Sequence, residues 1–426
     1  MSEAAQPSDP IQSTKPDQKG FTSYQKLVIG LLAFLQFTII LDFMIMSPLG
    51  ALLMPKLKIT PAQFGFVVSV YAFSAGTAGL LAAGFADRFD RKKLLLFFYT
   101  GFVVGTLLCG LATTYQFLVF ARMVTGLFGG VIGSIILAIT TDLFALEVRG
   151  RVMGVIQAAL SASQVLGLPL GLYFSNLWGW HAPFFMIVIV SSIVGVGILF
   201  YLKPIDGHLK LQNLRHPFKS LLETAFRPRY CLAYFTTALL TTGGFMLMPF
   251  ASSFNVNNLG LTLEQLPIVY MVTGGVSIFT GPYIGRLSDR FGKLRVFGIG
   301  SAISIAMVTT YTHLNFAPLW LVITISVVMF MGISSRMITS MALVSAVPEP
   351  SRRGTFMSLN SSTQQITGGI STAIAGLVVA EGADGRLSHY DILGFIVVGA
   401  MVVSIFLMIT ISRIVGRSYH KNPELI

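Results

Sequence analysis

The stretch ADRFDRKK at residues 86–93 decides the fold of this chain, because part of it occurs twice. The letters DRF at residues 87–89 return at residues 289–291, and RGRVMG at residues 149–154 returns as RGTFMS at residues 353–358. The two separations are 202 and 204 residues. Two segments that repeat at nearly the same separation indicate a chain built from two halves of similar architecture.

The composition is that of a membrane protein. Of 426 residues, 54% are hydrophobic and only 11% are charged, whereas soluble domains carry about 25% charged residues. The mean hydropathy is +0.76, and the apolar residues fall in blocks of about 20, the length of a helix that crosses a bilayer. We predict an all-α polytopic membrane protein with twelve transmembrane helices, at residues 26–53, 63–84, 93–113, 116–141, 152–174, 181–202, 230–253, 265–286, 295–313, 318–345, 355–379 and 391–415.

Basic residues collect in alternate loops. Of the 29 lysines and arginines, 24 fall in the termini and in every second loop, and three fall in the opposite loops. Because cytoplasmic loops are enriched in lysine and arginine, we expect both termini in the cytoplasm. This placement also accounts for the net charge of +12 without nucleic acid. Trp178, Trp180 and Trp320 fall at the expected outer boundaries, where amphipathic rings settle.

The repeat and the basic loops divide the chain into five parts. Residues 1–25 are expected to form a disordered cytoplasmic tail, because they are polar and contain prolines. Paired repeats with a substrate site between them are the architecture of secondary transporters. We therefore predict an N-terminal six-helix half at 26–202, a cytoplasmic linker at 203–229, a C-terminal six-helix half at 230–417 and a cytoplasmic tail at 418–426.

The repeated loops resemble a known family. GRLSDRFGKLR at residues 285–295 keeps the frame Gly-x-x-x-Asp-Arg-x-Gly of the major facilitator superfamily, although the copy at 83–93 has Ala83 and Asp90 in place of the two glycines. Within that superfamily the chain resembles the twelve-span drug:proton antiporters and sugar-efflux permeases. The segments that carry this second resemblance are LDFMIMSPLG at 41–50, ARMVTGLFGG at 121–130, LFALEVRGRVMG at 143–154 and LGLPLGLYFSNLWGWHAPFF at 166–185.

Asp42 is the only acid well inside a predicted span. A charge at mid-bilayer costs about 2.5–3.5 kcal/mol, and such residues face the bundle interior and usually have a partner. At about 1.5 Å per helical residue, Asp42 and Arg122 reach a similar depth, and in the resembled superfamily their two spans line the central cavity. We expect the two side chains to meet there. The hypothesis is that Asp42 carries a proton, since burial and a nearby arginine shift a carboxyl pKa in opposite directions. The alternative is a permanent structural ion pair.

A substrate cavity is expected where the central spans meet. Flexible methionine side chains adapt to varied ligands, and Gln164 shares one polar face of its span with Gln157 and Ser161. The alternatives are plain helix packing for the methionines and hydrogen bonds between helices for the polar face. Arg336 lies toward the cytoplasmic end of its span, where it either attracts anionic groups or extends to the headgroups. The predicted cavity residues are Thr38, Met46, Gln164, Phe245, Met248 and Arg336.

The resemblance also implies a cytoplasmic gate, in which the repeated loop pairs with the end of span 4 while the site faces outward. The alternative is that these charges only set the topology. Hinges are expected at Gly167, Pro169, Gly171, Gly243 and Gly244, because proline and paired glycines kink helices. The predicted gate residues are Asp87, Arg88, Arg91 and Asp142, with Asp289 and Arg290 as a weaker counterpart.

The sequence contains no P-loop, dinucleotide fingerprint, metal-ligand cluster or activated nucleophile. We therefore predict no enzyme and no cofactor, with a proton gradient as the energy source. The predicted function is proton-coupled efflux of small amphipathic compounds, drugs or sugars, by a monomer in a bacterial inner membrane. The alternatives are transport of a defined small solute, a lipid flippase, and a sensor that does not transport. The expected partners are a small-molecule substrate, protons and the lipid bilayer.

Overall fold

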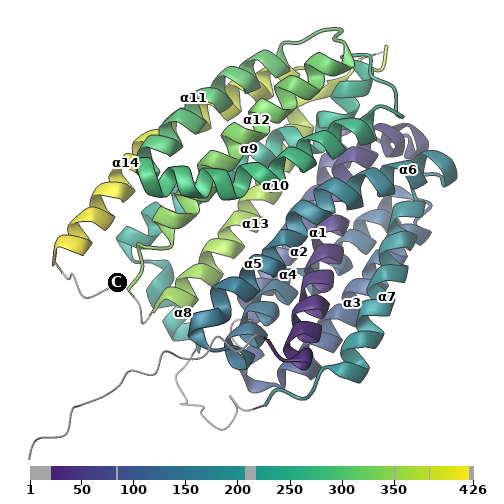
Figure 1. The fold of residues 1–426 in the computed structure, drawn as a ribbon. Coiled ribbons are helices and arrows are strands. Elements are labelled where there is room, and N and C mark those ends of the chain that lie inside the picture. Colours follow the sequence, from purple (N-terminus) through teal and green to yellow (C-terminus); the bar gives the residue numbers. More distant parts are fainter. Residues whose placement is uncertain (1–20, 83–84, 207–216, 350–351, 383, 422–426) are drawn as a thin grey trace, which may run out of the picture.

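Long apolar helices make up most of the chain in this computed structural model, which describes residues 21–82, 85–206, 217–349, 352–382 and 384–421 (Figure 1). The first half begins with α1 and ends with α7. A short 3-10 turn, η1 (Ala86–Arg88), precedes α3, and the π-helical segment η2 (Ser163–Gly167) joins α5 to α6. The helices of this half are α1 (Ser23–Leu57), α2 (Pro61–Ala82), α3 (Arg91–Leu111), α4 (Tyr115–Leu143), α5 (Leu146–Ala162), α6 (Leu168–Trp178) and α7 (Ala182–Tyr201).

The second half begins with α9 and ends with α14, and it lies beside the first half in Figure 1. A short helix, α8, precedes it, and a two-stranded hairpin of β1 (Ala380–Glu381) and β2 (Leu387–Ser388) separates α13 from α14. The helices are α8 (Pro217–Ala225), α9 (Pro228–Asn257), α10 (Leu266–Phe291), α11 (Lys293–Thr312), α12 (Leu319–Val344), α13 (Arg353–Val378) and α14 (Tyr390–Lys421).

Within the described residues, eleven helices are long and apolar enough to cross a membrane, with α5, η2 and α6 counted as one. The remaining predicted span, at residues 355–379, corresponds to α13, which is 26 residues long but carries a polar stripe that includes Asn360 and Gln364. Each predicted span overlaps one of these helices, with ends that differ by a few residues. The predicted class, twelve transmembrane helices in two six-helix halves, is confirmed.

The ends of the halves fall partly outside the described residues. Residues 1–20, 207–216 and 422–426 are not described, so the predicted tails and the extent of the linker stay predictions. Two local elements were missed. α8 lies inside the predicted linker, where Pro217 occupies its first position, a common helix start. The Asp384-Gly385 pair is a hairpin signal that indicates the short β-turn between β1 and β2.

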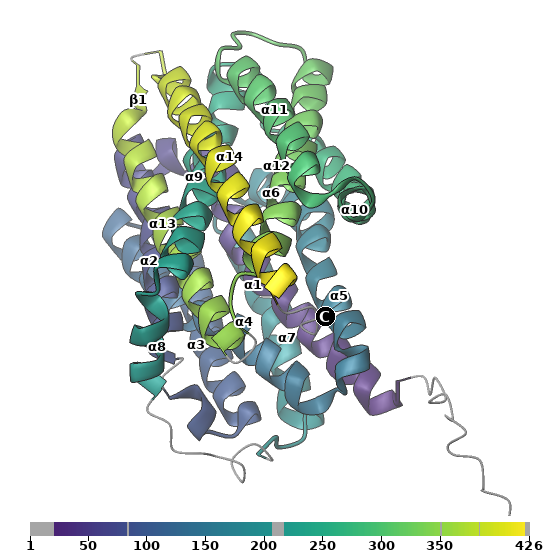
Figure 2. The ribbon, with the colours of Figure 1, turned by 90° about the vertical axis from the view of Figure 1, so that its left-hand side faces the viewer.

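Small residues bring the two halves together. α13 packs along α2 and also contacts α9, as Figure 2 shows. A Cβ added at Gly65 would lie 3.0 Å from the carbonyl oxygen of Thr372, and one at Gly376 would lie 2.9 Å from that of Pro61. The Ser47 hydroxyl donates to the Met248 carbonyl, which ties α1 to α9. These contacts lie away from the end where the basic loops gather, which we call the basic end (Arg88, Arg149, Arg290 and Arg352).

Aromatic residues at the opposite end behave in two ways. Trp178 and Trp320 are 71% and 67% exposed, as expected for rings at a membrane boundary. Trp180 is only 5% exposed, and its ring stacks on the His181 ring with centroids 3.7 Å apart. Trp180 lies in the connection between α6 and α7, as the predicted boundary requires, but its ring is packed inside the protein and is not exposed there.

Candidate functional site

Asp42 and Arg122 form an ion pair inside the first half. Arg122 Nη1 lies 2.8 Å from Asp42 Oδ2, and the Thr106 hydroxyl donates to Asp42 Oδ1 at 3.2 Å. Both charged side chains are fully buried. Three helices, α1, α3 and α4, therefore converge on one carboxylate at the depth that helical geometry predicted from the sequence.

Arg122 is only partly satisfied by this partner. Its guanidinium lies over the Tyr71 ring, 4.3 Å from the centroid, in a cation–π contact. Its Nε and Nη2 have no hydrogen-bond acceptor within the described part of the chain. A buried cation with one acid and one ring as its main partners depends strongly on that acid, because an uncompensated buried charge is costly.

The position of the pair differs from the expectation in one respect. Asp42 and Arg122 do not line the central cavity described below, because both side chains turn toward α3 and α2 within their own half. The next residues along α1 do face the other half, since Met44 lines the central cavity and Phe43 contacts Phe245 at 5.6 Å between ring centroids. α1 thus presents the acid on one side and apolar residues on the other.

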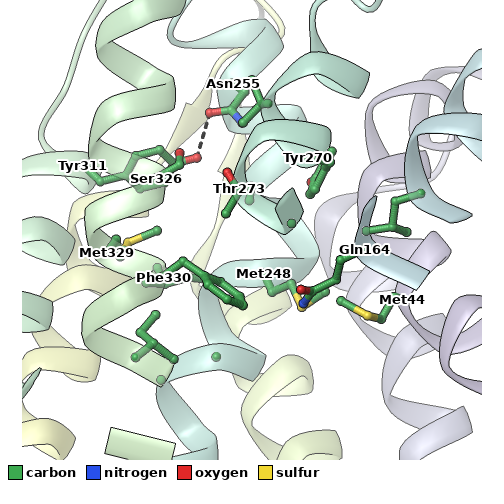
Figure 3. A pocket seen from close by; sticks show the side chains of 18 of the residues that line it. Met44, Gln164, Met248, Asn255, Tyr270, Thr273, Tyr311, Ser326, Met329 and Phe330 are labelled. Carbon is green, nitrogen blue, oxygen red and sulfur yellow. Dashed lines mark hydrogen bonds between the residues drawn. The ribbon is translucent and has the colours of Figure 1, made fainter. Parts of the chain in front are cut away.

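A cavity of about 230 Å³ lies between the halves (Figure 3). Only Met44, Gln164 and Leu168 of its 19 lining residues come from the first half, and the rest come mainly from α9, α10 and α12. Its walls are mainly apolar, with Met248, Met329 and Phe330 prominent in Figure 3. Methionine and phenylalanine side chains give such a cavity a surface that adapts to ligands of different shape.

The structure brings together some of the predicted cavity residues and separates others. Gln164 and Met248 line the cavity, and Phe245 lines a smaller neighbouring cavity of about 30 Å³ that Met248 shares. Thr38 does not reach either cavity, because its hydroxyl lies against Leu35 O and Tyr99 Oη. Met46 is fully buried and also lies outside both. Alternate positions on α1 face different helices, which the sequence pattern did not resolve.

Arg336 points away from the cavity. Its Nη1 donates to the Ser301 hydroxyl at 3.0 Å and its Nη2 to the Ser404 hydroxyl at 2.8 Å, so it is held between α11 and α14. The guanidinium lies 5.3 Å from the Phe297 ring centroid, and the residue is 4% exposed. Both predicted roles, attraction of anions into the cavity and extension to the headgroups, fail in this structure because the side chain is enclosed by its own half.

Several lining residues were not predicted. Asn255 Oδ1 accepts from the Tyr311 hydroxyl at 2.7 Å, and the Tyr270 hydroxyl lies 2.9 Å from the Ser252 hydroxyl. Thr273 also lines the cavity, and its hydroxyl oxygen is buried with no hydrogen-bond partner in the described residues. Polar residues in apolar helices were the available signal, but that signal alone does not tell cavity walls from helix contacts.

The predicted hinge in span 5 coincides with an irregular turn. The Leu168 amide donates to Ser163 O, five residues earlier, and Pro169 follows immediately without an amide hydrogen to donate. Such π turns are frequent at functional sites. A Cβ at Gly167 would lie 2.6 Å from Leu41 Cδ1, and one at Gly171 would lie 2.7 Å from Ile45 Cδ1, so both glycines let α1 approach.

The second predicted hinge keeps a regular helix. α9 continues through Gly243 and Gly244, and both glycines line the cavity. A Cβ at Gly244 would meet no atom within 4 Å, whereas one at Gly243 would lie 3.4 Å from Val397 Cγ1. The hinge role of these five residues stays a prediction.

At the basic end, Arg91 Nε lies 3.1 Å from Asp142 Oδ2 and joins the start of α3 to the end of α4. The Asp87 side chain lies outside the described residues. Arg88 is exposed, and no ion pair joins Asp289 or Arg290 to another described residue. Asp90, which replaces a glycine of the family pattern, accepts from the Lys93 amide at 2.8 Å and caps α3.

Two repeated helical halves that enclose a cavity define the class of secondary membrane transporters. The chain belongs to the major facilitator superfamily, since the model of that family matches residues 32–372. These findings identify a transporter and not an enzyme.

Curated relatives and solved structures agree with this family. The chain is 27% identical over 346 residues to the MFS-type transporter YceJ of Bacillus subtilis, covering 80% of this chain and 86% of that one. It is 23% identical over 282 residues to multidrug resistance protein 2 of Bacillus subtilis, covering 64% and 69%. Its fold is similar to that of a D-xylose–proton symporter, with a TM-score of 0.73 and 14% identity over 90% of this chain and 97% of that one.

Proposed function

We propose that this transporter exports small amphipathic compounds in exchange for protons, with Asp42 as the proton carrier. The observation that carries the proposal is the buried pair of Asp42 and Arg122, since ionisable groups inside membrane spans are functional by default. The likeness to multidrug resistance protein 2 supports efflux of drugs. The mainly apolar cavity between the halves supports an amphipathic cargo.

Coupling follows from the dependence of Arg122 on one acid. When Asp42 takes up a proton, Arg122 loses its only acidic partner among the described residues, while its Nε and Nη2 already lack acceptors. A buried charge that loses its partner is strongly destabilising. The protonated form therefore favours a rearrangement of α1 against α4, and α1 also contributes Met44 to the cavity wall.

The remaining assignments complete an alternating-access cycle. Contacts between the halves at Gly65, Gly376 and Ser47 lie toward the end opposite the basic end, and in this proposal they close the transporter toward the outside. In this proposal the basic end and both termini face the cytoplasm of a bacterial inner membrane. Arg91 and Asp142 latch the basic end in the outward-facing state, the span 5 turn and α9 act as hinges, and the protein works as a monomer.

The test is accumulation of several chemically distinct dyes in efflux-deficient cells that express the wild type or Asp42→Asn, with and without a protonophore. We expect the wild type to lower accumulation and the protonophore and the mutation each to abolish this effect. Asp206→Asn, which changes an exposed acid of the linker, is the matched control and should behave as the wild type. Full proton-dependent efflux by correctly folded Asp42→Asn would exclude Asp42 as the carrier.

A further inference from the structure

The central cavity has no charged residue on its wall. None of the 19 lining residues in the described part of the chain is acidic or basic. The two charged residues that the sequence predicted near the cavity make contacts within their own halves. Asp42 pairs with Arg122, and Arg336 donates to the hydroxyls of Ser301 and Ser404. An ion that left water for this cavity would lose hydration without gaining a counter-charge, which is a large cost.

Hydrogen-bonding groups on the wall are few, and most of them already have protein partners. Tyr311 donates to Asn255, Tyr270 pairs with Ser252, and the Tyr390 hydroxyl donates to Leu247 O at 3.0 Å. Two hydroxyls among the lining residues have no hydrogen-bond partner in the described residues, those of Ser326 and Thr273, and the Thr273 oxygen is the buried one of the two. Buried polar atoms are normally hydrogen-bonded, so an unpaired buried hydroxyl of a lining residue gains most from a ligand that reaches it.

Gln164 supplies a second polar contact from the first half. Its Oε1 lies 3.2 Å from the Ser277 hydroxyl, which also donates to Gly274 O at 2.6 Å, and its amide NH2 remains as a donor. The residue lies in η2, whose backbone packs against Gly274, where a Cβ would lie 3.0 Å from the Gln164 carbonyl carbon. In Figure 3 Gln164 lies beside Met44 and Met248, with Thr273 farther along the same wall.

We propose that the cavity takes an uncharged, largely apolar molecule whose polar group hydrogen-bonds to Thr273, with Gln164 as a second contact. The inference rests on the proposed function for the exchange with protons. Asp42 is the only buried acid among the described residues, so one proton enters for each molecule exported. Because the exported molecule is uncharged, every cycle moves one net positive charge inward.

Three probes with aromatic frameworks test the charge preference. N-phenyl-1-naphthylamine is neutral, 1-anilino-8-naphthalenesulfonate adds one negative charge to the same framework, and tetraphenylphosphonium is a permanent cation. With the purified full-length protein in nanodiscs, we expect the neutral probe to raise the unfolding temperature at a concentration at least about tenfold lower than either ion, a gap that corresponds to about 1.4 kcal/mol. Equal or tighter binding of either ion would overturn the proposal.

Thr273→Val tests the contact point, because valine keeps the shape and removes the hydroxyl. Loss of one hydrogen bond is expected to weaken binding of N-phenyl-1-naphthylamine about 3- to 10-fold. Thr310→Val is the control, since Thr310 is exposed on α11 and its hydroxyl donates only to Ala306 O. Unchanged binding in folded Thr273→Val would overturn the assignment of Thr273 as a contact. Equal losses of binding in both variants would overturn it as well, because the loss would then not depend on the position of the hydroxyl.

Charge movement separates this inference from the proposed function. Proteoliposomes on a solid-supported membrane receive a jump of N-phenyl-1-naphthylamine at equal pH on both sides, and a dye inside reports pH. We expect a current together with a pH change, both absent in Asp42→Asn. A pH change with tetraphenylphosphonium alone would overturn the uncharged cargo and keep proton coupling. No pH change with any probe would overturn proton coupling, and Thr273-dependent binding of the neutral probe would then still support the cavity assignment.

Discussion

Each half buries one arginine well inside a predicted span, and the two are satisfied in different ways. Arg122 in the first half pairs with Asp42 and leaves two nitrogens without acceptors, whereas Arg336 in the second half is held by the hydroxyls of Ser301 and Ser404. A cation paired with an acid responds to a proton on that acid, and a cation held by hydroxyls does not. The comparison teaches that burial of a charge in a span does not by itself mark a site for ion coupling.

Arg122→Gln is expected to have the largest effect. The substitution leaves the Asp42 carboxylate buried without a cation, and breaking a buried pair from one side costs about 3–5 kcal/mol. The measurement is the free energy of unfolding in mixed micelles. A cost below about 1 kcal/mol would mean that the pair is solvated, and would break the contrast with Arg336.

The double variant Asp42→Asn with Arg122→Gln sharpens the same contrast. Because both charges are removed together, we expect it to be more stable than Arg122→Gln by about 2 kcal/mol or more, since no unpaired buried charge remains. A double-mutant cycle with Asp42→Asn alone gives the coupling energy. Additive losses would show that the two side chains do not depend on one another.

Arg336→Met is expected to change stability by only about 1 kcal/mol. Methionine matches the length of the apolar stem, and Ser301 and Ser404 still donate to Phe297 O and Met401 O of their own helices. Dye efflux should remain, because Arg336 lies outside the cavity. Loss of efflux in a stable Arg336→Met variant would show that transport requires Arg336 as well as Arg122, and would contradict the comparison.

The smallest expected effect concerns His181, which lies between α6 and α7. Burial lowers the pKa of His181 below its usual value, and its Nδ1 donates to Gly110 O at 3.0 Å. Its contribution to stability is therefore complete above about pH 6.5, the ordinary histidine value, and is lost as the pH falls toward the folded-state pKa. His181→Gln should flatten the acid side of the stability curve slightly and leave dye efflux unchanged. An unchanged acid limb would assign that limb entirely to other groups.

The order of the helices was predictable because it depends on local properties. Apolar blocks of bilayer length, basic loops in alternation and the repeated DRF loop determine how many times the chain crosses and that its halves correspond. The depth of Asp42 and Arg122 followed from the constant rise of a helix. Even the departure at Asp90 has a local explanation, since an aspartate before a helix caps its first amides.

The tertiary structure alone decided which way the side chains face. Apolar residues cover all sides of a transmembrane helix, so the sequence pattern carries little information on which face meets a cavity, a neighbouring helix or lipid. For that reason Met44 lines the cavity while Met46 is buried, and Arg336 turns to two serines instead of the cavity. The free hydroxyl of Thr273 likewise depends on contacts among helices distant in sequence, and no local pattern in the chain encodes them.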